Sequence, residues 1–167
     1  AEDIPGDGID QDCSGSDAEV TGRILDDVLT GELIVTEVMN NPYSVGDDVG
    51  EWVEIFNNSN SDIDLNGLVV SDNGDDSFTV TESILIPSRE HVVFGLSLDT
   101  AVNGGVTASF AYSGFILSNN ADEVILSHNG RVLDEMVYSS DLGYGMSVGK
   151  SLSLDVDKYD FNDNDVS

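Results

Sequence analysis

Hydrophobic and polar residues alternate along this chain, and the alternation is clearest between Gly31 and Asn58. In the run WVEIF at residues 52–56, Val53 and Ile55 fall on one side of an extended backbone and their three neighbours fall on the other. The earlier run at 33–39 is almost continuously apolar and rich in β-branched residues, which is typical of a strand covered on both faces. The pattern predicts two strands joined by an acidic, glycine-containing loop.

Similar short runs continue to the end of the chain, separated by turn residues. Asn129-Gly130 lies between two long alternating runs and predicts the clearest β-hairpin of the sequence. No segment after Gly31 has a convincing helical period, so the sequence predicts an all-β domain of the sandwich or barrel type. We expect strands near residues 32–39, 51–57, 63–71, 77–81, 84–86, 91–96, 107–112, 122–128, 131–138 and 151–154.

The segment Ser16–Leu29 carries conflicting signals. Ser16 and Glu19 form a capping box, and apolar residues recur there at helical spacing. Thr21 and Gly22 disfavour a helix. A short helix and an additional strand are both open, and we favour a strand-like or irregular connector.

Three motifs follow one another in the order GELIVTEVMNNP, EWVEIFN and DIDLNGLVVSD. Together they resemble the lamin tail domain family, whose members are immunoglobulin-like β-sandwiches and which bacteria use in secreted and surface proteins. Near the end, GKSLSL resembles the closing strand of the family, with Ser153 where a basic residue is usual. The resemblance implies a sandwich over residues 31–154, an acidic N-terminal extension over 1–30 and an acidic tail or linker over 155–167.

The charge of the chain is extreme. Five Lys and Arg residues stand against 33 Asp and Glu, for a net charge of −28. Nucleic acids and anionic membrane surfaces are therefore excluded as partners, because both are bound by basic side chains. No apolar run reaches the roughly 18 residues of a membrane span. Because self-repulsion opposes a compact state, we expect bound divalent cations, and oxygen ligands favour Ca²⁺.

The N-terminal string DGIDQDCSGSD is the leading calcium candidate. It resembles short acidic metal-binding motifs of secreted bacterial proteins and the aspartate-rich calcium repeats of thrombospondin-type proteins. Position 12 of a helix–loop–helix calcium loop falls on Thr21 instead of a glutamate, so Asp17 or Glu19 would have to complete the site. The alternative is a solvated acidic linker. When the loop is counted from Asp10, positions 1, 3, 5, 6 and 7 are occupied by Asp10, Asp12, Ser14, Gly15 and Ser16, as the calcium loop requires.

Further carboxylates are weaker candidates for calcium. Glu37 and Glu54 lie inside apolar runs, where a carboxylate must be paired, hydrogen-bonded or metal-bound. The alternative for them is an internal hydrogen-bonded pair assisted by Asn40 or Asn57, and the alternative for loop aspartates is an Asx-turn. The loop and tail candidates are Asp72, Asp75, Asp76, Asp155, Asp157, Asp160, Asp163 and Asp165, and the acidic loop before the second strand adds Asp47, Asp48 and Glu51.

Catalytic constellations are not evident. Residues 145–149 match G-x-S-x-G, but that motif needs a strand–turn–helix context and a later histidine, and the last histidine is His128. His91 and His128 are expected at strand ends. We therefore expect a protein that is not an enzyme.

The function that these features favour is a secreted or cell-surface, calcium-binding structural or adhesive module. It would belong to a filament, sheath or surface layer and bind itself or other extracellular proteins. The alternative is an accessory glycan- or cell-wall-binding module of a secreted hydrolase, with exposed aromatic residues such as Tyr43 and Trp52 as the signature. Cys13 is the single cysteine, either a free thiol or paired outside this chain.

Overall fold

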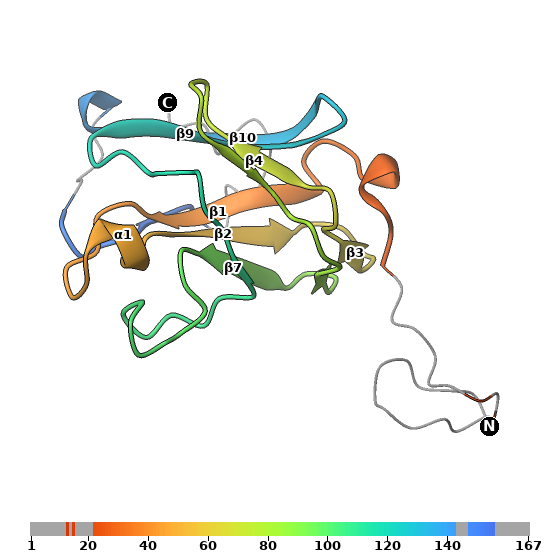
Figure 1. The fold of residues 1–167 in the computed structure, drawn as a ribbon. Coiled ribbons are helices and arrows are strands. Elements are labelled where there is room, and N and C mark those ends of the chain that lie inside the picture. Colours follow the sequence, from red (N-terminus) through yellow and green to blue (C-terminus); the bar gives the residue numbers. More distant parts are fainter. Residues whose placement is uncertain (1–12, 14, 16–21, 143–146, 156–167) are drawn as a thin grey trace.

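The computed structural model describes residues 13, 15, 22–142 and 147–155. Two β-sheets lie face to face around an apolar core (Figure 1). In spatial order, the first contains β11 (Leu152–Ser153), β1 (Leu33–Met39), β2 (Trp52–Asn57), β7 (His91–Gly95) and β8 (Phe110–Ala111). The second contains β10 (Arg131–Ser139), β9 (Ala121–His128), β4 (Val69–Ser71) and β5 (Ser77–Thr79). The predicted β-sandwich is confirmed.

Strands β1 and β2 pair antiparallel at the centre of the first sheet. Val53 and Ile55 belong to the core, whereas Trp52 and Glu54 are half-buried on the other face. Residues Leu33 to Thr36 are buried without alternation, so the prediction of a strand covered on both faces is also confirmed.

The hairpin of β9 and β10 turns at Asn129-Gly130, as predicted. Both turn residues have positive φ, 50° and 76°, the backbone that a two-residue turn matching the strand twist requires. This hairpin supplies Val124, Leu126 and Leu133 to the core opposite the first sheet.

The prediction of one strand over residues 63–71 is wrong. The segment forms β3 (Ile63–Asp64), which pairs with β6 (Leu85–Ile86) in a separate two-stranded sheet, and then β4 in the second sheet. A turn at Asn66-Gly67, with φ of 89° at the glycine, lies between them, so the chain crosses from one sheet to another within the stretch that was predicted as one strand. The expected strand at 107–112 is likewise reduced to β8.

Helical structure in the described ranges is limited to single turns. These are η1 (Leu25–Asp27), α1 (Asp47–Gly50) and η2 (Ser140–Leu142). No helix in the described part of the chain has the length and apolar character needed to cross a bilayer.

The described part of the N-terminal connector is irregular, as favoured from the sequence, and it packs onto the sandwich. Arg23 forms an isolated parallel bridge with Ile63, and Leu25 and Val28 are core residues. The guanidinium of Arg131 donates to the carbonyls of Leu25 and Val28, which holds the connector against β10.

Candidate functional site

Helical turn α1 lies at one end of the sandwich (Figure 1). Its residues line two hollows of the surface, Gly50 one of them and Asp47 and Asp48 the other. We call them the acidic hollow and the aromatic hollow. The acidic hollow has a volume of about 370 Å³ and is lined by Asp47, Asp48, Glu51, Leu96, Ser113, Gly114, Phe115 and Ile116. Its walls come from segments that are distant in sequence: α1, the end of β7, and the chain after β8.

Glu51 is the unusual residue of the acidic hollow. It ends α1 just before β2, and only 2% of its surface is exposed. Its Oε2 accepts a hydrogen bond of 3.0 Å from the amide of Leu117. Burial raises the pKa of Glu51 to about 7, and the negative charges of Asp47 and Asp122 act in the same direction. A buried carboxylate is therefore placed among other acids without a basic partner in the described part of the chain.

Polar groups around Glu51 are incompletely hydrogen-bonded. The hydroxyl of Tyr112, a residue only 3% exposed, has no hydrogen-bond partner among the described residues, and neither has the buried Oδ1 of Asn119. Asn119 does donate through Nδ2 to Asp47, at 3.0 Å. Burial also raises the pKa of Asp122, whose Oδ2 accepts the amide of Ser118 at 2.7 Å. Most buried polar groups in folded proteins are hydrogen-bonded, either to protein groups or to ordered water.

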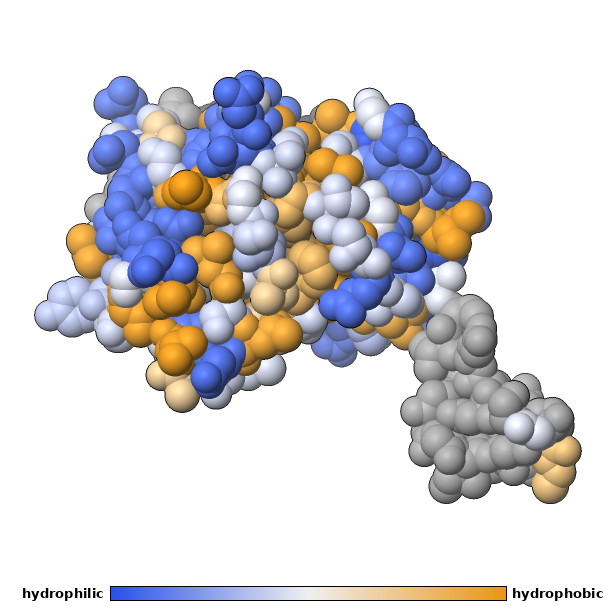
Figure 2. Space-filling model, in the orientation of Figure 1, coloured by the Kyte–Doolittle hydropathy of each residue, from blue (hydrophilic) through white to orange (hydrophobic). Residues whose placement is uncertain are grey.

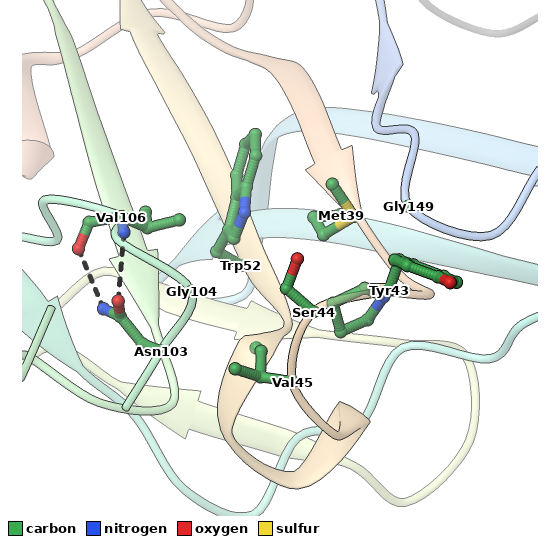
Figure 3. A pocket seen from close by; sticks show the side chains of 11 residues that line it. Met39, Tyr43, Ser44, Val45, Trp52, Asn103, Gly104, Val106 and Gly149 are labelled. Atoms are coloured by element: carbon green, nitrogen blue, oxygen red, sulfur yellow. Dashed lines mark hydrogen bonds between the residues drawn. The ribbon is translucent and has the colours of Figure 1, made fainter. Parts of the chain in front are cut away.

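The aromatic hollow has a volume of about 120 Å³ (Figure 3). Tyr43 is 82% exposed and Trp52 is half-buried, and both side chains border it. Asn103 shapes the opposite rim, because its Nδ2 donates to the carbonyl of Val106 and its Oδ1 accepts the amide of Val106. The other lining residues are Met39, Pro42, Ser44, Val45, Gly50, Gly104 and Gly149.

Gly149 fits closely against the aromatic hollow. A Cβ at this position would lie 2.6 Å from the Cβ of Tyr43, and φ is 76°. The amide of Gly149 also donates to the carbonyl of Asn41 at 2.7 Å. Only glycine allows this approach, which positions Tyr43 beside the chain that leads to β11.

Apolar side chains are exposed between acidic ones at this end of the molecule, where orange patches interrupt the blue surface (Figure 2). Ile116 of the acidic hollow is 65% exposed. Leu98 and Val102, on the loop that carries Asn103, are 54% and 45% exposed. An apolar surface with a polar rim is typical of an interaction site.

The calcium candidates of the termini lie mostly outside the described residues. This applies to Asp10, Asp12, Ser14, Ser16, Asp17 and Glu19, and to Asp157, Asp160, Asp163 and Asp165. Cys13 and Asp155 are described, and both are exposed.

The loop candidates Asp72, Asp75 and Asp76 lie between β4 and β5. Asp72 Oδ1 accepts the amides of Gly74 at 2.8 Å and of Asp76 at 3.1 Å, which is the Asx-turn arrangement. This carboxylate is therefore already used by its own loop. Calcium binding at these three residues stays a prediction.

Glu37 and Glu54 face each other across β1 and β2 on the side of the sheet away from the core. Glu37 accepts a hydrogen bond from the hydroxyl of Ser151, and Glu54 accepts one of 2.7 Å from Thr36. Both carboxylates thus have partners within the fold. These partners differ from those expected, because Asn40 donates to the carbonyl of Ser118 and Asn57 donates to backbone carbonyls.

Metal ligands and catalytic groups do not converge in the part of the chain that the structure describes. No group of three or more His, Cys, Asp and Glu residues there could hold a metal ion. His128 bonds the carbonyl of Gly67 at 2.9 Å and Asp26 at 3.1 Å, and His91 packs on the ring of Phe56. Ser147 of the G-x-S-x-G match lies just before a turn, and residues 145–146 are outside the described ranges.

Sequence reasoning recognised the acids of α1 but did not recognise the acidic hollow. Phe115 and Ile116 belong to a segment with no strand pattern, Leu96 ends a predicted strand, and nothing local brings these residues to Glu51. One usable signal was Phe115-Ile116 itself, an apolar pair in a stretch that lacks alternation.

Comparison with curated proteins finds no match. Comparison with family models finds the lamin tail domain over residues 29–140, which is more than half of the chain. This is an immunoglobulin-like structural domain family and not a known enzyme family. The match agrees with the sandwich topology and with the motifs of β1 and β2. The chain belongs to the lamin tail domain family.

Proposed function

We propose that this chain is a non-catalytic, calcium-binding structural or adhesive module of a bacterial extracellular surface assembly, such as a filament, sheath or surface layer. Its partners would be further copies of itself or other extracellular proteins. The extracellular location rests on the resemblance of the chain to lamin tail domains of secreted bacterial proteins.

The observation that carries the proposal is the uncompensated charge of a folded sandwich. The chain has 33 acidic and five basic residues. Between residues of the described ranges, acid–base contacts are limited to Arg23–Glu32 and two histidine pairs, His91–Glu54 and His128–Asp26. Most carboxylates there have no cationic side chain beside them, so cations from solution are the natural counter-charge.

Calcium is the cation that suits this chain best. It accepts carboxylate, carbonyl and hydroxyl oxygens in flexible geometry and is abundant outside cells. The leading ligands in the proposal are Asp10, Asp12, Ser14 and the carbonyl of Ser16, completed by Asp17 or Glu19. Ions held at acidic loops can neutralise one copy and can also bridge two copies.

Calorimetric unfolding with calcium and with EGTA tests the proposal. We expect the melting temperature to rise with millimolar Ca²⁺ and to fall in EGTA, because an ion that binds only the folded chain stabilises it by mass action. Light scattering on the same samples is expected to show larger assemblies in Ca²⁺. The control is Mg²⁺ at the same concentration, which prefers stricter octahedral sites and is expected to act more weakly.

A melting temperature and an association state that do not respond to EGTA would contradict the calcium role. The variant D10N/D12N separates a specific site from general neutralisation, since it removes only two of many carboxylates. We expect it to lose most of the calcium effect.

The second candidate function is glycan binding, and the aromatic hollow favours it. Tyr43 and Trp52 border one depression from adjacent segments, and exposed aromatic rings are suitable platforms for sugar rings. Retention on insoluble polysaccharides tests it. The Tyr43→Ala variant is expected to lose retention, whereas absence of retention of the wild type on any polymer would argue against this function.

A further inference from the structure

We propose that the acidic hollow binds a lysine side chain of a protein partner, with the ammonium group at Glu51 and the methylene stem against Phe115 and Ile116. The inference names a partner for the adhesive role proposed above and rests on that role. It does not rest on calcium binding, and the two are tested separately.

The size and walls of the hollow suit such a side chain. Its volume of about 370 Å³ lies in the range of small ligand pockets, roughly 300–1,000 Å³. Leu96, Phe115 and Ile116 form an apolar wall, and Ile116 is 65% exposed when the hollow is empty. Lysine places its methylene stem along apolar surface while its charged end reaches a polar group.

Glu51 supplies the polar end. The residue is 2% exposed and lines the hollow, and its Oε1 accepts no hydrogen bond from the described residues, since the bond from Leu117 goes to Oε2. A buried carboxylate is costly unless it is paired. An ammonium group provides the missing counter-charge and the missing donor at the same atom.

The arrangement favours an ammonium group over a metal ion or a guanidinium. Asp47 and Asp48 line the same hollow as Glu51, yet these residues do not form a group that could hold a metal. An ammonium has three N–H donors that can reach separate acceptors, which suits carboxylates spread over a hollow. A guanidinium binds best to both oxygens of one carboxylate, and the amide of Leu117 takes one of the two acceptor positions of Glu51 Oε2, which leaves Oε1 as the freer oxygen.

Tyr112 adds an independent observation. Its hydroxyl is buried and has no hydrogen-bond partner within the described ranges, and the residue precedes Ser113, which lines the hollow. Burial raises the pKa of the Tyr112 phenol, and the charge of Glu51 acts in the same direction.

A nitrogen-15 NMR titration of the full chain tests the inference. The probe is Nα-acetyl-lysine methylamide, added in the presence of EGTA. We expect saturable shifts of the amides of Glu51, Leu96 and Ile116. The analogue acetylated on its side-chain nitrogen has the same stem without the charge, and we expect it to bind about tenfold more weakly or worse, the effect of one charge-assisted hydrogen bond.

Matched variants locate the effect. Glu51→Gln keeps the shape of the side chain and is expected to weaken binding of the lysine probe about tenfold. Glu82→Gln changes an exposed acid elsewhere and is expected to leave binding unchanged. The Ile116→Ser variant removes part of the apolar wall at an exposed position, so it is expected to fold normally and to bind the probe more weakly.

The pH dependence gives a second readout. The charged and titratable groups around Glu51 are Asp47 and Asp48, which line the same hollow, and Asp122, Tyr112 and Tyr138, and none of them is a cation. Because the pKa of Glu51 is about 7 and the ionised carboxylate is the binding form, affinity is expected to rise between pH 6 and pH 8. The Glu51→Gln variant is expected to lose this dependence.

Several outcomes would overturn the inference. They are equal binding of the lysine probe and its acetylated analogue, equal affinity at pH 6 and pH 8, tighter binding of the arginine analogue, and shifts spread over acids outside the hollow. Saturable shifts of the same amides by Ca²⁺ alone would assign the hollow to the metal. If the probe fails while calcium still raises the melting temperature, the lysine site is wrong and the calcium role stands.

Discussion

At the scale of single residues, Asn57 shows how much the fold depends on one buried amide. The residue is fully buried, and its Nδ2 donates to the carbonyls of Ser61 at 2.8 Å and Ile86 at 3.0 Å. Its Oδ1 accepts the amide and the hydroxyl of Ser59. The side chain therefore joins the end of β2 to the loop before β3 and to the end of β6.

We predict that Asn57→Ala lowers the free energy of unfolding by about 3 kcal/mol, because several buried groups lose their partners at once. The measurement is urea unfolding monitored by tryptophan fluorescence. Asn57→Asp keeps the acceptor and loses the donor, and a similar loss is expected. Asn66→Ala, at an exposed turn position, is the control, and a loss equal to that of Asn57→Ala would show that the buried network is not the cause.

Glu51 predicts an unusual dependence of stability on pH. Its pKa in the folded chain is about 7, above the ordinary value of 4.5 that the unfolded chain retains. Between these values the folded state binds a proton that the unfolded state does not, so stability falls as pH rises from about 4.5 to about 7 and then stays level. The shift corresponds to at most about 3 kcal/mol.

We expect Glu51→Gln to remove this slope and to stabilise the chain at pH 8 by up to about 3 kcal/mol. Unfolding in urea at pH 5, 6, 7 and 8, with EGTA present, measures it. Glu82→Gln, an exposed change, is expected to follow the wild type. A wild type that gains stability from pH 5 to pH 8 relative to Glu51→Gln would refute the burial of an uncompensated carboxylate.

Residue types alone did not reveal these roles. Asn57 follows an alternating strand and reads as a turn residue, and Glu51 reads as one more acid in an acidic loop. What distinguishes the two residues is their burial. Asn57 is buried against β6, where it bonds Ile86, and Glu51 is buried against the segment that contains Leu117. The alternation of Val53 and Ile55 was predictable because it is a property of a single strand.

At the scale of elements, the connector before β1 contains a matched pair of leucines. Leu25 lies in the core and is 1% exposed, whereas Leu29, four residues later, is 65% exposed. Loss of a buried leucine costs the transfer of its side chain and leaves a cavity, about 2–5 kcal/mol, whereas an exposed leucine costs little.

We therefore predict that Leu25→Ala lowers the melting temperature by about 6 °C or more, and that Leu29→Ala changes it by less than about 2 °C. Differential scanning calorimetry measures both. Equal effects of the two variants would mean that the connector is not part of the folded unit.

Elements were predictable where one local pattern defined them. The hairpin of β9 and β10 follows from two alternating runs and an Asn-Gly turn. The separation of β3 from β4 was missed although Asn66-Gly67 is a turn signal, because Leu65 and Leu68 continue the apolar pattern on either side of it. The turn is also stabilised by partners from other segments. The amide of Leu65 donates to the carbonyl of Ile84, and the amide of Gly67 donates to the carbonyl of Val80. Hydrogen bonds to residues that are distant in the sequence thus stabilise the turn between β3 and β4.

At the scale of the whole molecule, the two hollows beside α1 are products of topology. The acidic hollow joins residues 47–51, 96 and 113–116, and the aromatic hollow adds residue 149 to residues 39–52 and 103–106. A single sequence gives the fold class through its strands but does not give such junctions, because they combine strand ends with loops that have no period and that lie far apart in the sequence. The candidate site therefore had to come from the structure.

Net charge acts on the whole molecule and gives the last prediction. At −28 the folded chain repels itself more than the expanded unfolded chain does, and salt screens this repulsion. The screening length falls from about 30 Å at 0.01 M to about 10 Å at 0.1 M. We predict that NaCl between 10 and 500 mM raises the urea midpoint of unfolding in EGTA, with urea used because guanidinium is itself a salt.

Choline chloride at the same concentrations is the control for this salt effect, since screening depends on ionic strength and not on the cation. Equal rises in NaCl and choline chloride would identify screening, and one millimolar Ca²⁺, which adds little ionic strength, would then act only through bound ions. A midpoint that does not respond to either monovalent salt would mean that the carboxylates are spread widely enough to be solvated independently. Charge repulsion would then not favour the binding of cations, and the net charge would no longer support a calcium-binding role.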